Sequence, residues 1–328
     1  MEIRKECNLI KYYGHTHPIN ATSPEVLFMN ALCEGRVEDV KSFFREKKLF
    51  GNKPPVVDCM YGRYEGLDGI EEFARGWLSR FQAESAYITP VVQTIANGRV
   101  VLETVVNFVV DGAFNQVPMF VVGDFRTSQL LEEVRMYCHF SFVPDLQAYR
   151  KPMFVSAHLE TGDPGLLTGA VGEYYEALHH SPAVDVERIL ETMGENCIFG
   201  GYEGWGSDCN PHTTREDLRR AYEGMATYIP RCVGMRYETI IDDGKTCVIE
   251  WQHIVTKAGW EERHRIAISA ISAYERGEDG KLCSIRICDY AGFEKTIDWS
   301  KVPDATFEEA RSINYVESYS PYIGVKKI

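Results

Sequence analysis

The chain has 328 residues, of which 45% are apolar, 25% charged and 12% aromatic. This length suggests about two domains, and the composition is typical of globular proteins. A formal net charge of −13 argues against nucleic-acid binding, which needs a basic surface. The start of the chain lacks the apolar segment of a secretory signal, and no apolar run approaches the roughly 18 residues of a membrane span. We therefore expect a cytoplasmic protein that binds neither nucleic acid nor membrane.

In the first half of the chain, three predicted helices precede a run of strands. Ser23 and Pro24 begin a helix that Gly35 closes, and the apolar spacing predicts further helices over 37–49 and from Ile70 to Phe81. A short extended segment is expected at 56–61. Long β-rich runs follow at 91–95, 100–110, 117–125 and 130–142, with turn signals at the Asn-Gly pair 97–98 and the Asp-Gly pair 111–112.

The second half repeats this order. Its predicted helices cover 167–178, 184–193 and 215–229, and its predicted strands run near 235–241, 247–256, 263–274 and 282–290. The repeat is also literal, because residues 58–66 (DCMYGRYEG) align without a gap with residues 196–204 (NCIFGGYEG). Glu103 and Glu250 lie 147 residues apart, as do Gly112 and Gly259. A period this long exceeds the roughly 20–50 residues of solenoid repeats and indicates a duplicated domain.

Helices followed by strands indicate an α+β fold. We expect two tandem cone-shaped domains, each with three helices packed on a curled, mostly antiparallel sheet whose open end suits a small molecule. The predicted organisation is an N-terminal extension (1–20), a first domain (21–143), a Pro- and Gly-containing linker (144–166), a second domain (167–303) and a C-terminal tail (304–328).

The element order and several short motifs resemble the nuclear transport factor two-like superfamily, within it the SnoaL-like and ketosteroid isomerase group. The matching segments are 31–35 (ALCEG), 64–73 (YEGLDGIEEF) and 134–136 (VRM) in the first copy, and 177–178 (AL), 202–204 (YEG) and 280–286 (GKLCSIR) in the second. Relatives include isomerases, dehydratases, polyketide cyclases, epoxide hydrolases and non-catalytic binding modules, and they commonly pair through the outer face of the sheet. The resemblance therefore implies an internal pseudo-dimer, which can assemble further into a homo-oligomer.

The second copy carries the candidate catalytic residues. Tyr174 stands where the resemblance implies a tyrosine that hydrogen-bonds a developing oxyanion, and the first copy has Phe28 there. On the strand before Gly259, His253 suits proton transfer at neutral pH. On the last strand, Asp289 shares a face with two isoleucines and resembles the acid–base aspartate of the cyclases. The expected substrate-binding residues are Trp251, Val255, Ser272, Ile287 and Tyr202.

Each of these residues also has a purely structural interpretation. Tyr174 suits a core position with its hydroxyl at the rim. His253 suits a hydrogen-bonded core or interface position, and Asp289 a solvated strand end. In the first copy, Asp58 resembles the general-base aspartate of ketosteroid isomerase, whereas the second copy has Asn196 at that place. A first-copy site based on Asp58 therefore remains a competing hypothesis.

The sequence favours cofactor-independent acid–base chemistry. It contains no helical His pair or Cys/His spacing for a metal, no phosphate loop and no G-x-S-x-G motif. We expect an isomerase, dehydratase (a lyase) or cyclase acting on a hydrophobic, oxygenated small molecule such as a steroid-like or polyketide-like compound. The alternative is a non-catalytic small-molecule-binding or assembly module. An epoxide hydrolase would need an Asp-Arg-Asp set inside one cone, and that requires Arg286 to point inward.

Overall fold

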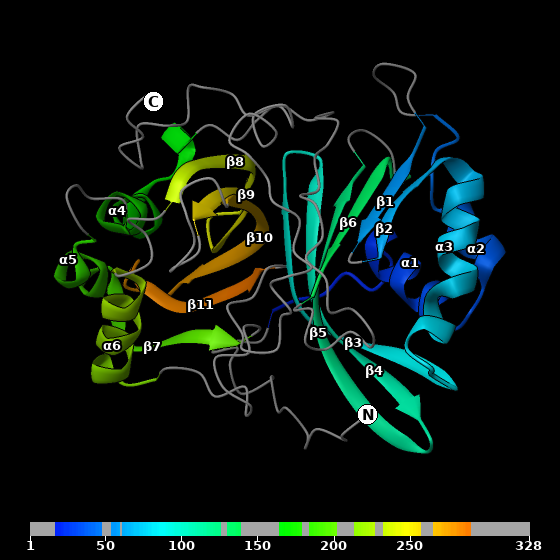
Figure 1. Cartoon of the computed structure of the whole chain (residues 1–328), viewed down its shortest axis with the longest axis horizontal. Helices are drawn as coiled ribbons and strands as arrows, with labels where there is room; N and C mark the ends of the chain where they lie inside the picture. The colour runs from blue at the N-terminus through cyan, green and yellow to red at the C-terminus, as the bar shows by residue number, and fades with distance from the viewer. Residues whose placement is uncertain are drawn as a thin grey trace. The chain divides into compact units, whose positions relative to one another are not determined.

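The structure is a computed structural model that describes residues 17–47, 54–59, 61–125, 130–138, 164–178, 184–201, 213–226, 232–256 and 265–289. The chain divides into two compact units, Met1–Gln147 and Ala148–Ile328. Both are α+β, with helices on one face of a single curved sheet (Figure 1). The expected fold class is therefore confirmed, while the exact domain boundaries and the internal pseudo-dimer stay predictions.

The first unit contains three helices and a six-stranded sheet. Its elements are α1 (Pro24–Cys33), α2 (Val37–Ser42), β1 (Val56–Cys59), β2 (Gly62–Glu65), α3 (Gly66–Arg80), β3 (Ser85–Ala96), β4 (Arg99–Val110), β5 (Ala113–Asp124) and β6 (Glu133–Tyr137). The strand order is β2-β1-β6-β5-β4-β3, in which only the β1–β6 pair is parallel among the described strands.

The second unit repeats this plan with a five-stranded sheet in its described part. Its elements are a short 3-10 turn (Pro164–Leu166), α4 (Gly169–Leu178), α5 (Val186–Glu191), β7 (Met193–Gly201), α6 (Arg215–Ala226), β8 (Cys232–Asp242), β9 (Thr246–Thr256), β10 (Arg265–Arg276) and β11 (Leu282–Asp289). The strand order is β7-β11-β10-β9-β8, with β7 and β11 parallel. This order matches the β1-β6-β5-β4-β3 part of the first sheet, so the duplication extends to topology.

The hairpin turns form where the sequence predicts them. Asn97 and Asp111 have φ of 52° and 51°, and the glycine after each has φ of 74° and 72°. Two successive residues with positive φ are the mark of a type I′ turn, which matches the right-handed twist of paired strands. Strand lengths were less predictable: β3 begins six residues earlier than expected, and β2 was not expected at all.

Aromatic contacts identify the face of the first sheet that meets the helices. Phe108 on β4 stacks on Phe81 at a centroid distance of 4.0 Å and lies 6.0 Å from Trp77 of α3. Because strand side chains alternate between faces, the register carries this assignment across the sheet. We call this side the helix face and the opposite side the outer face. In the second unit, Tyr274 on β10 marks the helix face through ring contacts with Tyr174 and Tyr175 of α4.

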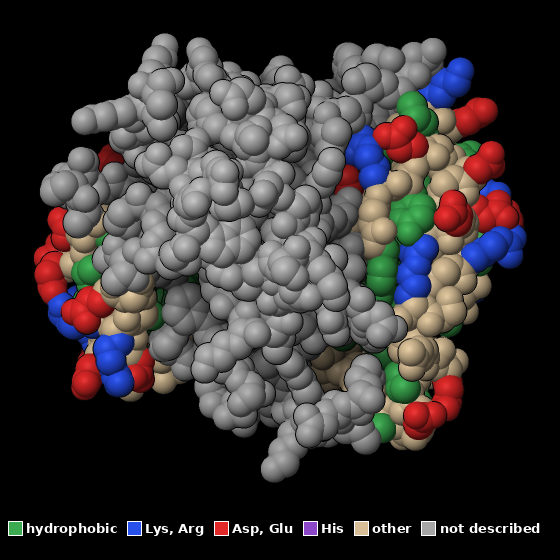
Figure 2. Space-filling view, in the orientation of Figure 1, with side chains coloured by type: hydrophobic (Ala, Val, Ile, Leu, Met, Phe, Trp, Pro, Cys, Tyr) green, Lys and Arg blue, Asp and Glu red, His purple; other side chains and the backbone are tan. Residues whose placement is uncertain are grey.

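The exposed sides of the helices carry charges of both signs (Figure 2). Around α2 and α3, Glu71 receives a hydrogen bond of 2.6 Å from Lys41 and another from Arg75. In the second unit, Arg188 of α5 bonds Glu176 of α4 at 2.6 Å. Such exposed pairs contribute little to stability. Among the described helices, none is long and apolar enough to span a membrane.

Candidate functional site

Five buried tyrosines gather between the helices and the sheet of the second unit. They are Tyr174 and Tyr175 on α4, Tyr222 on α6, Tyr237 on β8 and Tyr274 on β10, and each is at most 2% exposed. The ring of Tyr174 contacts the rings of Tyr175, Tyr222 and Tyr274 at centroid distances of 5.2–5.9 Å. Ring packing of this kind places several phenolic hydroxyls within an apolar interior.

The hydroxyls of Tyr174, Tyr175, Tyr222 and Tyr274 form a continuous hydrogen-bond network. Tyr222 donates to Tyr174 over 3.0 Å, and the hydroxyls of Tyr175 and Tyr274 lie 2.8 Å apart. Tyr174 and Ser272 also hydrogen-bond the Tyr274 hydroxyl. The Ser272 hydroxyl in turn accepts from the indole N–H of Trp251 at 2.8 Å. Tyr274 is therefore the point on which the network converges.

The direction of these bonds follows from the number of donors and acceptors. A phenolic hydroxyl has one proton to donate and two lone pairs that accept. Trp251 can only donate, so the Ser272 proton is available for Tyr274. Tyr222 donates to Tyr174, which leaves the Tyr174 proton for Tyr274 as well. In the Tyr175–Tyr274 pair either hydroxyl can donate, and where Tyr175 does so the Tyr274 proton is left for a further acceptor.

Burial shifts the ionisation of the cluster. It raises the pKa of the Tyr175 and Tyr222 hydroxyls well above the ordinary value. Burial also raises the pKa of Tyr274, while the hydrogen bonds from Tyr175, Ser272 and Tyr174 act in the opposite direction. At neutral pH all three phenols therefore hold their protons and serve as hydrogen-bond donors. Among them, Tyr274 has the hydroxyl whose anion would receive the most hydrogen bonds.

The strand register places the other expected site positions next to this network. Trp251 pairs with Ala270, and Ala270 pairs with Asp289, so the three occupy one row across β9, β10 and β11. Ser272 pairs with Ile287 in the adjacent row. Both Trp251 and Ile287 are buried at 8% exposure. Four of the expected positions thus meet on two adjacent rows of the helix face.

The remaining expected positions are described only in part. His253 pairs with Ile268 and Met235 along β9, and Val255 pairs with Ile266. The side chains of His253, Val255 and Asp289 lie outside the described part of the structure. The whole of Tyr202 lies outside it. Their placement in the site therefore rests on strand position for the first three and on sequence for Tyr202.

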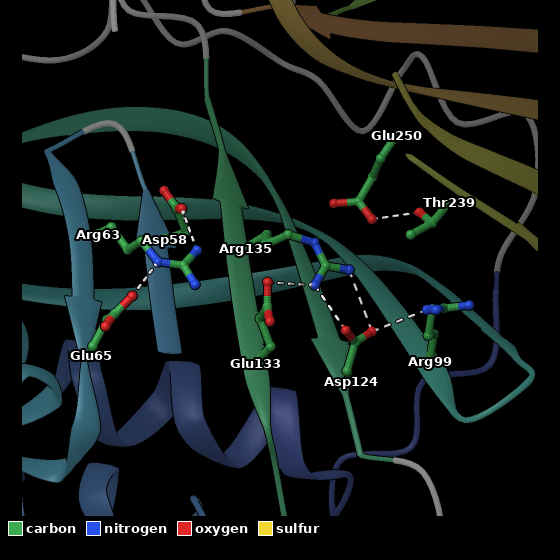
Figure 3. A network of polar contacts seen from close by, with 9 residues as sticks. All are labelled: Asp58, Arg63, Glu65, Arg99, Asp124, Glu133, Arg135, Thr239 and Glu250. Carbon is green, nitrogen blue, oxygen red and sulfur yellow. Dashed lines mark hydrogen bonds and ion pairs between the residues drawn. The ribbon is translucent and has the colours of Figure 1, made fainter. Parts of the chain in front are cut away.

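Asp58 lies on the outer face of the first sheet. It is 1% exposed and accepts a hydrogen bond of 3.2 Å from Arg63 of β2, which also bonds Glu65 (Figure 3). In the register Asp58 stands opposite Arg135 of β6, whereas its neighbour Val57 is on the helix face. The structure therefore brings Asp58 together with a guanidinium, on the side of the sheet away from Phe28.

Buried ion pairs occupy equivalent outer-face positions in both units. Arg135 bonds Asp124 at 2.9 Å in the first unit, and Arg286 bonds Glu275 at 3.0 Å in the second. Arg99 also approaches Asp124 at 3.3 Å (Figure 3). Because Arg286 points to the outer face, it supplies no arginine for an Asp-Arg-Asp set among the helix-face residues. These pairs belong to the shared scaffold.

Tyr174 is the member of this tyrosine cluster that the sequence predicts as a site residue. Tyr175, Tyr222, Tyr237 and Tyr274 come from four different elements, and no local motif joins them. One signal was available, because Tyr274 follows Ser272 by two residues and therefore shares its strand face. Among the described residues, no group of three or more His, Cys, Asp or Glu is arranged to hold a metal ion.

Comparison with known proteins finds likeness in structure alone. No family model and no curated protein sequence matches the chain. One similar solved structure is the epoxide hydrolase/cyclase-like enzyme SalBIII, 19% identical over 39% of this chain and 90% of that one, with a TM-score of 0.30. Another is a hypothetical protein with a ketosteroid isomerase-like fold from Catenulispora acidiphila, 15% identical over 38% and 91%, with a TM-score of 0.32.

A third is a putative polyketide cyclase from Sinorhizobium meliloti, 12% identical over 34% of this chain and 92% of that one, with a TM-score of 0.28. Each of these structures covers about the length of one unit, and at such identities the likeness says nothing of activity. The observed order of two helices, a strand, a helix and four strands, to which the first unit adds β2, is the order on which the sequence resemblance rests. The structure therefore has the element order of the nuclear transport factor two-like fold that the sequence resemblance implied.

Proposed function

We propose that the second unit is a cofactor-independent acid–base catalyst, an isomerase, dehydratase or cyclase, for a hydrophobic molecule that carries a carbonyl oxygen. The observation behind this proposal is the convergence of hydroxyl donors on Tyr274 in a buried setting. Hydrogen-bond donors that are fixed before the reaction stabilise an oxyanion strongly, because they need no reorganisation as charge develops. Tyr174, expected from the resemblance, belongs to this donor set.

The row that joins Trp251, Ala270 and Asp289 is the proposed substrate position. Ala270 has the smallest side chain of the row, and the first unit has Met119 at the equivalent place, opposite Thr104. At the position of Ala270 itself the second unit therefore lacks a side chain that Met119 supplies in the first, while Trp251 stands in place of Thr104 beside it. Asp289, with His253 one row further along the strands, is the proposed proton acceptor. A substrate there would have the Ser272–Tyr274 donors on one side and the base on the other.

Binding of substituted phenols tests the donor network without knowledge of the substrate. A phenol resembles an enolate, and binding in the ionised form shifts its ultraviolet absorption to longer wavelength. We expect the wild-type protein to bind phenolates, and Tyr274→Phe and Tyr174→Phe to weaken that binding by about tenfold to 100-fold, since a hydrogen bond to a charged group is worth about 1.5–3 kcal/mol. The control is Tyr87→Phe, at a half-exposed tyrosine of the first unit. Equal phenolate affinity in Tyr274→Phe and wild type would contradict the proposal.

The second candidate function is a non-catalytic binding or assembly module. It is favoured by the tight ring packing of the five tyrosines, which are as buried as any core residue. In that case the hydroxyl bonds serve only to satisfy buried polar groups. A module of this kind would bind no phenolate, and Tyr274→Phe would change only its stability.

A further inference from the structure

Trp251 makes a hydrogen bond that links two rows of the second sheet. It lies on β9 opposite Ala270, whereas Ser272 lies opposite Ile249, so the indole reaches diagonally across the helix face. Its N–H donates to the Ser272 hydroxyl over 2.8 Å. Trp251 is 8% exposed and Ser272 is fully buried, so the bond lies inside the protein. The sequence predicts both residues as substrate contacts, but the observed contact is between the two.

The indole N–H differs from the hydroxyls of the network because it can donate a hydrogen bond but cannot accept one. Each hydroxyl can do both, so a chain of hydroxyls by itself can run in either direction. The bond from Trp251 removes this freedom at one end. Ser272 must accept there, and its own proton then points to the hydroxyl of Tyr274, which it hydrogen-bonds. The chemistry of one side chain thus sets the direction of this relay.

Burial makes the opposite direction unfavourable. If Ser272 accepted a hydrogen bond from Tyr274, the Ser272 proton would need a different acceptor, and Ser272 is shielded from solvent. A buried donor without an acceptor costs free energy, whereas hydrogen bonds in series polarise and strengthen one another. The indole therefore favours a Ser272 that donates to Tyr274.

The first unit has the same strands without this relay. The register places Thr104, Val121 and Gly123 at the positions of Trp251, Ser272 and Tyr274. Thr104 uses its hydroxyl to bond the backbone carbonyl of Thr89 on the neighbouring strand at 3.0 Å. All three relay positions thus differ together between the copies. A relay needed only to hold the shared sheet together would be expected in both.

We infer that Trp251 is a positioning residue, which acts on Tyr274 through Ser272 by fixing the direction of the hydrogen bond between them. In this role the indole N–H matters more than the apolar face of the ring. The inference rests on the proposed function for its consequence, because a Tyr274 that receives a hydrogen bond from Ser272 has its own proton available for a ligand oxygen. An apolar wall would need the ring of Trp251 but not its N–H.

The free protein tests this direction without any ligand. Trp251 is replaced by β-(3-benzothienyl)alanine, which keeps the shape of the ring system and has sulfur in place of the N–H. Tyrosine labelled with carbon-13 at Cζ reports by NMR whether each phenol donates or accepts, and Tyr274→Phe identifies the Tyr274 signal. We expect the replacement to shift the Tyr274 signal and to leave unchanged that of Tyr87, an exposed tyrosine of the first unit.

Ser272→Ala separates the relay from a direct effect of the ring. It should shift the Tyr274 signal by itself, and in its background the benzothienyl replacement should add no further shift, because the relay is already broken. Ser272→Thr keeps a hydroxyl and should keep the sensitivity to the replacement. An unchanged Tyr274 signal in the benzothienyl variant, or a shift of equal size in the Ser272→Ala background, would overturn the inference.

Ligand affinity then tests the consequence. The benzothienyl replacement should weaken phenolate binding about threefold to tenfold, the contribution of one hydrogen bond. The affinity for anisole, which has no ionisable hydroxyl, should stay within about twofold. Equal losses for both ligands would assign Trp251 to an apolar wall and overturn the inference. If the wild type bound no phenolate, the proposed function would be rejected, and the NMR shifts would still decide the role of Trp251.

Discussion

The two units place their buried polar groups on different elements of the same fold. In the second unit the sheet supplies them, through Trp251, Ser272 and Tyr274, and the tyrosines of α4 and α6 complete the set. In the first unit the equivalent strand positions hold Thr104, Val121 and Gly123. There the polar groups come from Ser23 and Glu25 at the start of α1, with Gln93 on the edge strand. Duplication kept the scaffold and changed the elements that carry the buried polar groups.

The largest expected effect concerns the scaffold that both units keep. Removing one partner of a buried ion pair leaves an uncompensated charge, which costs about 3–5 kcal/mol. Arg286→Met should therefore lower the free energy of unfolding of the second unit by that amount, and Arg135→Met should lower that of the first by less, because Arg99 still lies 3.3 Å from Asp124. Urea unfolding measures both. The double variant Arg286→Met with Glu275→Met should recover most of the loss. A cost below about 1 kcal/mol in Arg286→Met, or a larger cost in Arg135→Met than in Arg286→Met, would contradict this prediction.

The next effect separates the two units by activity. Asp289→Asn and His253→Ala should each reduce turnover at least about 100-fold, the usual contribution of an acid–base group, with little change in melting temperature. Asp58→Asn should leave turnover within about threefold, because Asp58 lies on the outer face against Arg63. All three variants are to be measured on one substrate. If Asp58→Asn were inactive and Asp289→Asn active, the catalytic site would be in the first unit.

A smaller effect tests the row that holds the proposed substrate. Ala270→Met gives the second unit the side chain that the first unit has at Met119, and it should weaken phenolate binding about tenfold by filling the substrate position. The reciprocal change, Met119→Ala, serves as the control and should leave phenolate binding unchanged. Titration of the phenol absorption band measures both. Tight binding in Ala270→Met would mean that the ligand lies elsewhere.

The smallest effect is a pH dependence confined to the second unit. Burial raises the pKa of Asp242, but the hydrogen bonds from Arg276 and from the Gly244 N–H outweigh it, so the net pKa is lowered from 3.8. A lowered folded pKa stabilises the native state fully above the unfolded value and loses that contribution as pH falls through the folded value.

In the first unit Ile95 takes the place of Asp242, so the effect has no counterpart there. Asp242→Asn should lower the free energy of unfolding by no more than about 1 kcal/mol, because the pair is partly exposed. Unfolding in urea at pH 7, 5 and 4 should show the same difference at the first two values and a smaller one at pH 4. A difference that grew on acidification would contradict the assigned sign.

Sequence periodicity predicted the elements well, because the apolar spacing of α3 and the Asn97-Gly98 turn are local signals. It was harder to predict from the sequence which face of the sheet each residue of a short strand points to. β1 has only four residues, so a shift of one residue decides whether Asp58 or Cys59 points to the helices. The tyrosine network and the cluster of Ser23, Glu25 and Gln93 were beyond sequence reasoning for a different reason. Each joins residues from separate elements, such as Ser23 and Gln93, which come together only when α1 packs on β3.

Gly123 has a consequence for how the two copies can evolve. It occupies the strand position of Tyr274, and even a methyl group there would come within 2.9 Å of Leu131 and close to Glu25. The step from glycine to tyrosine is therefore blocked while Leu131 and Val100 keep their side chains beside it. The second copy has the smaller Cys247 at the strand position of Val100. Position 123 is therefore epistatic with its neighbours, and intermediate sequences between the copies should be rare, because the strand can accept a tyrosine only after those neighbours have changed.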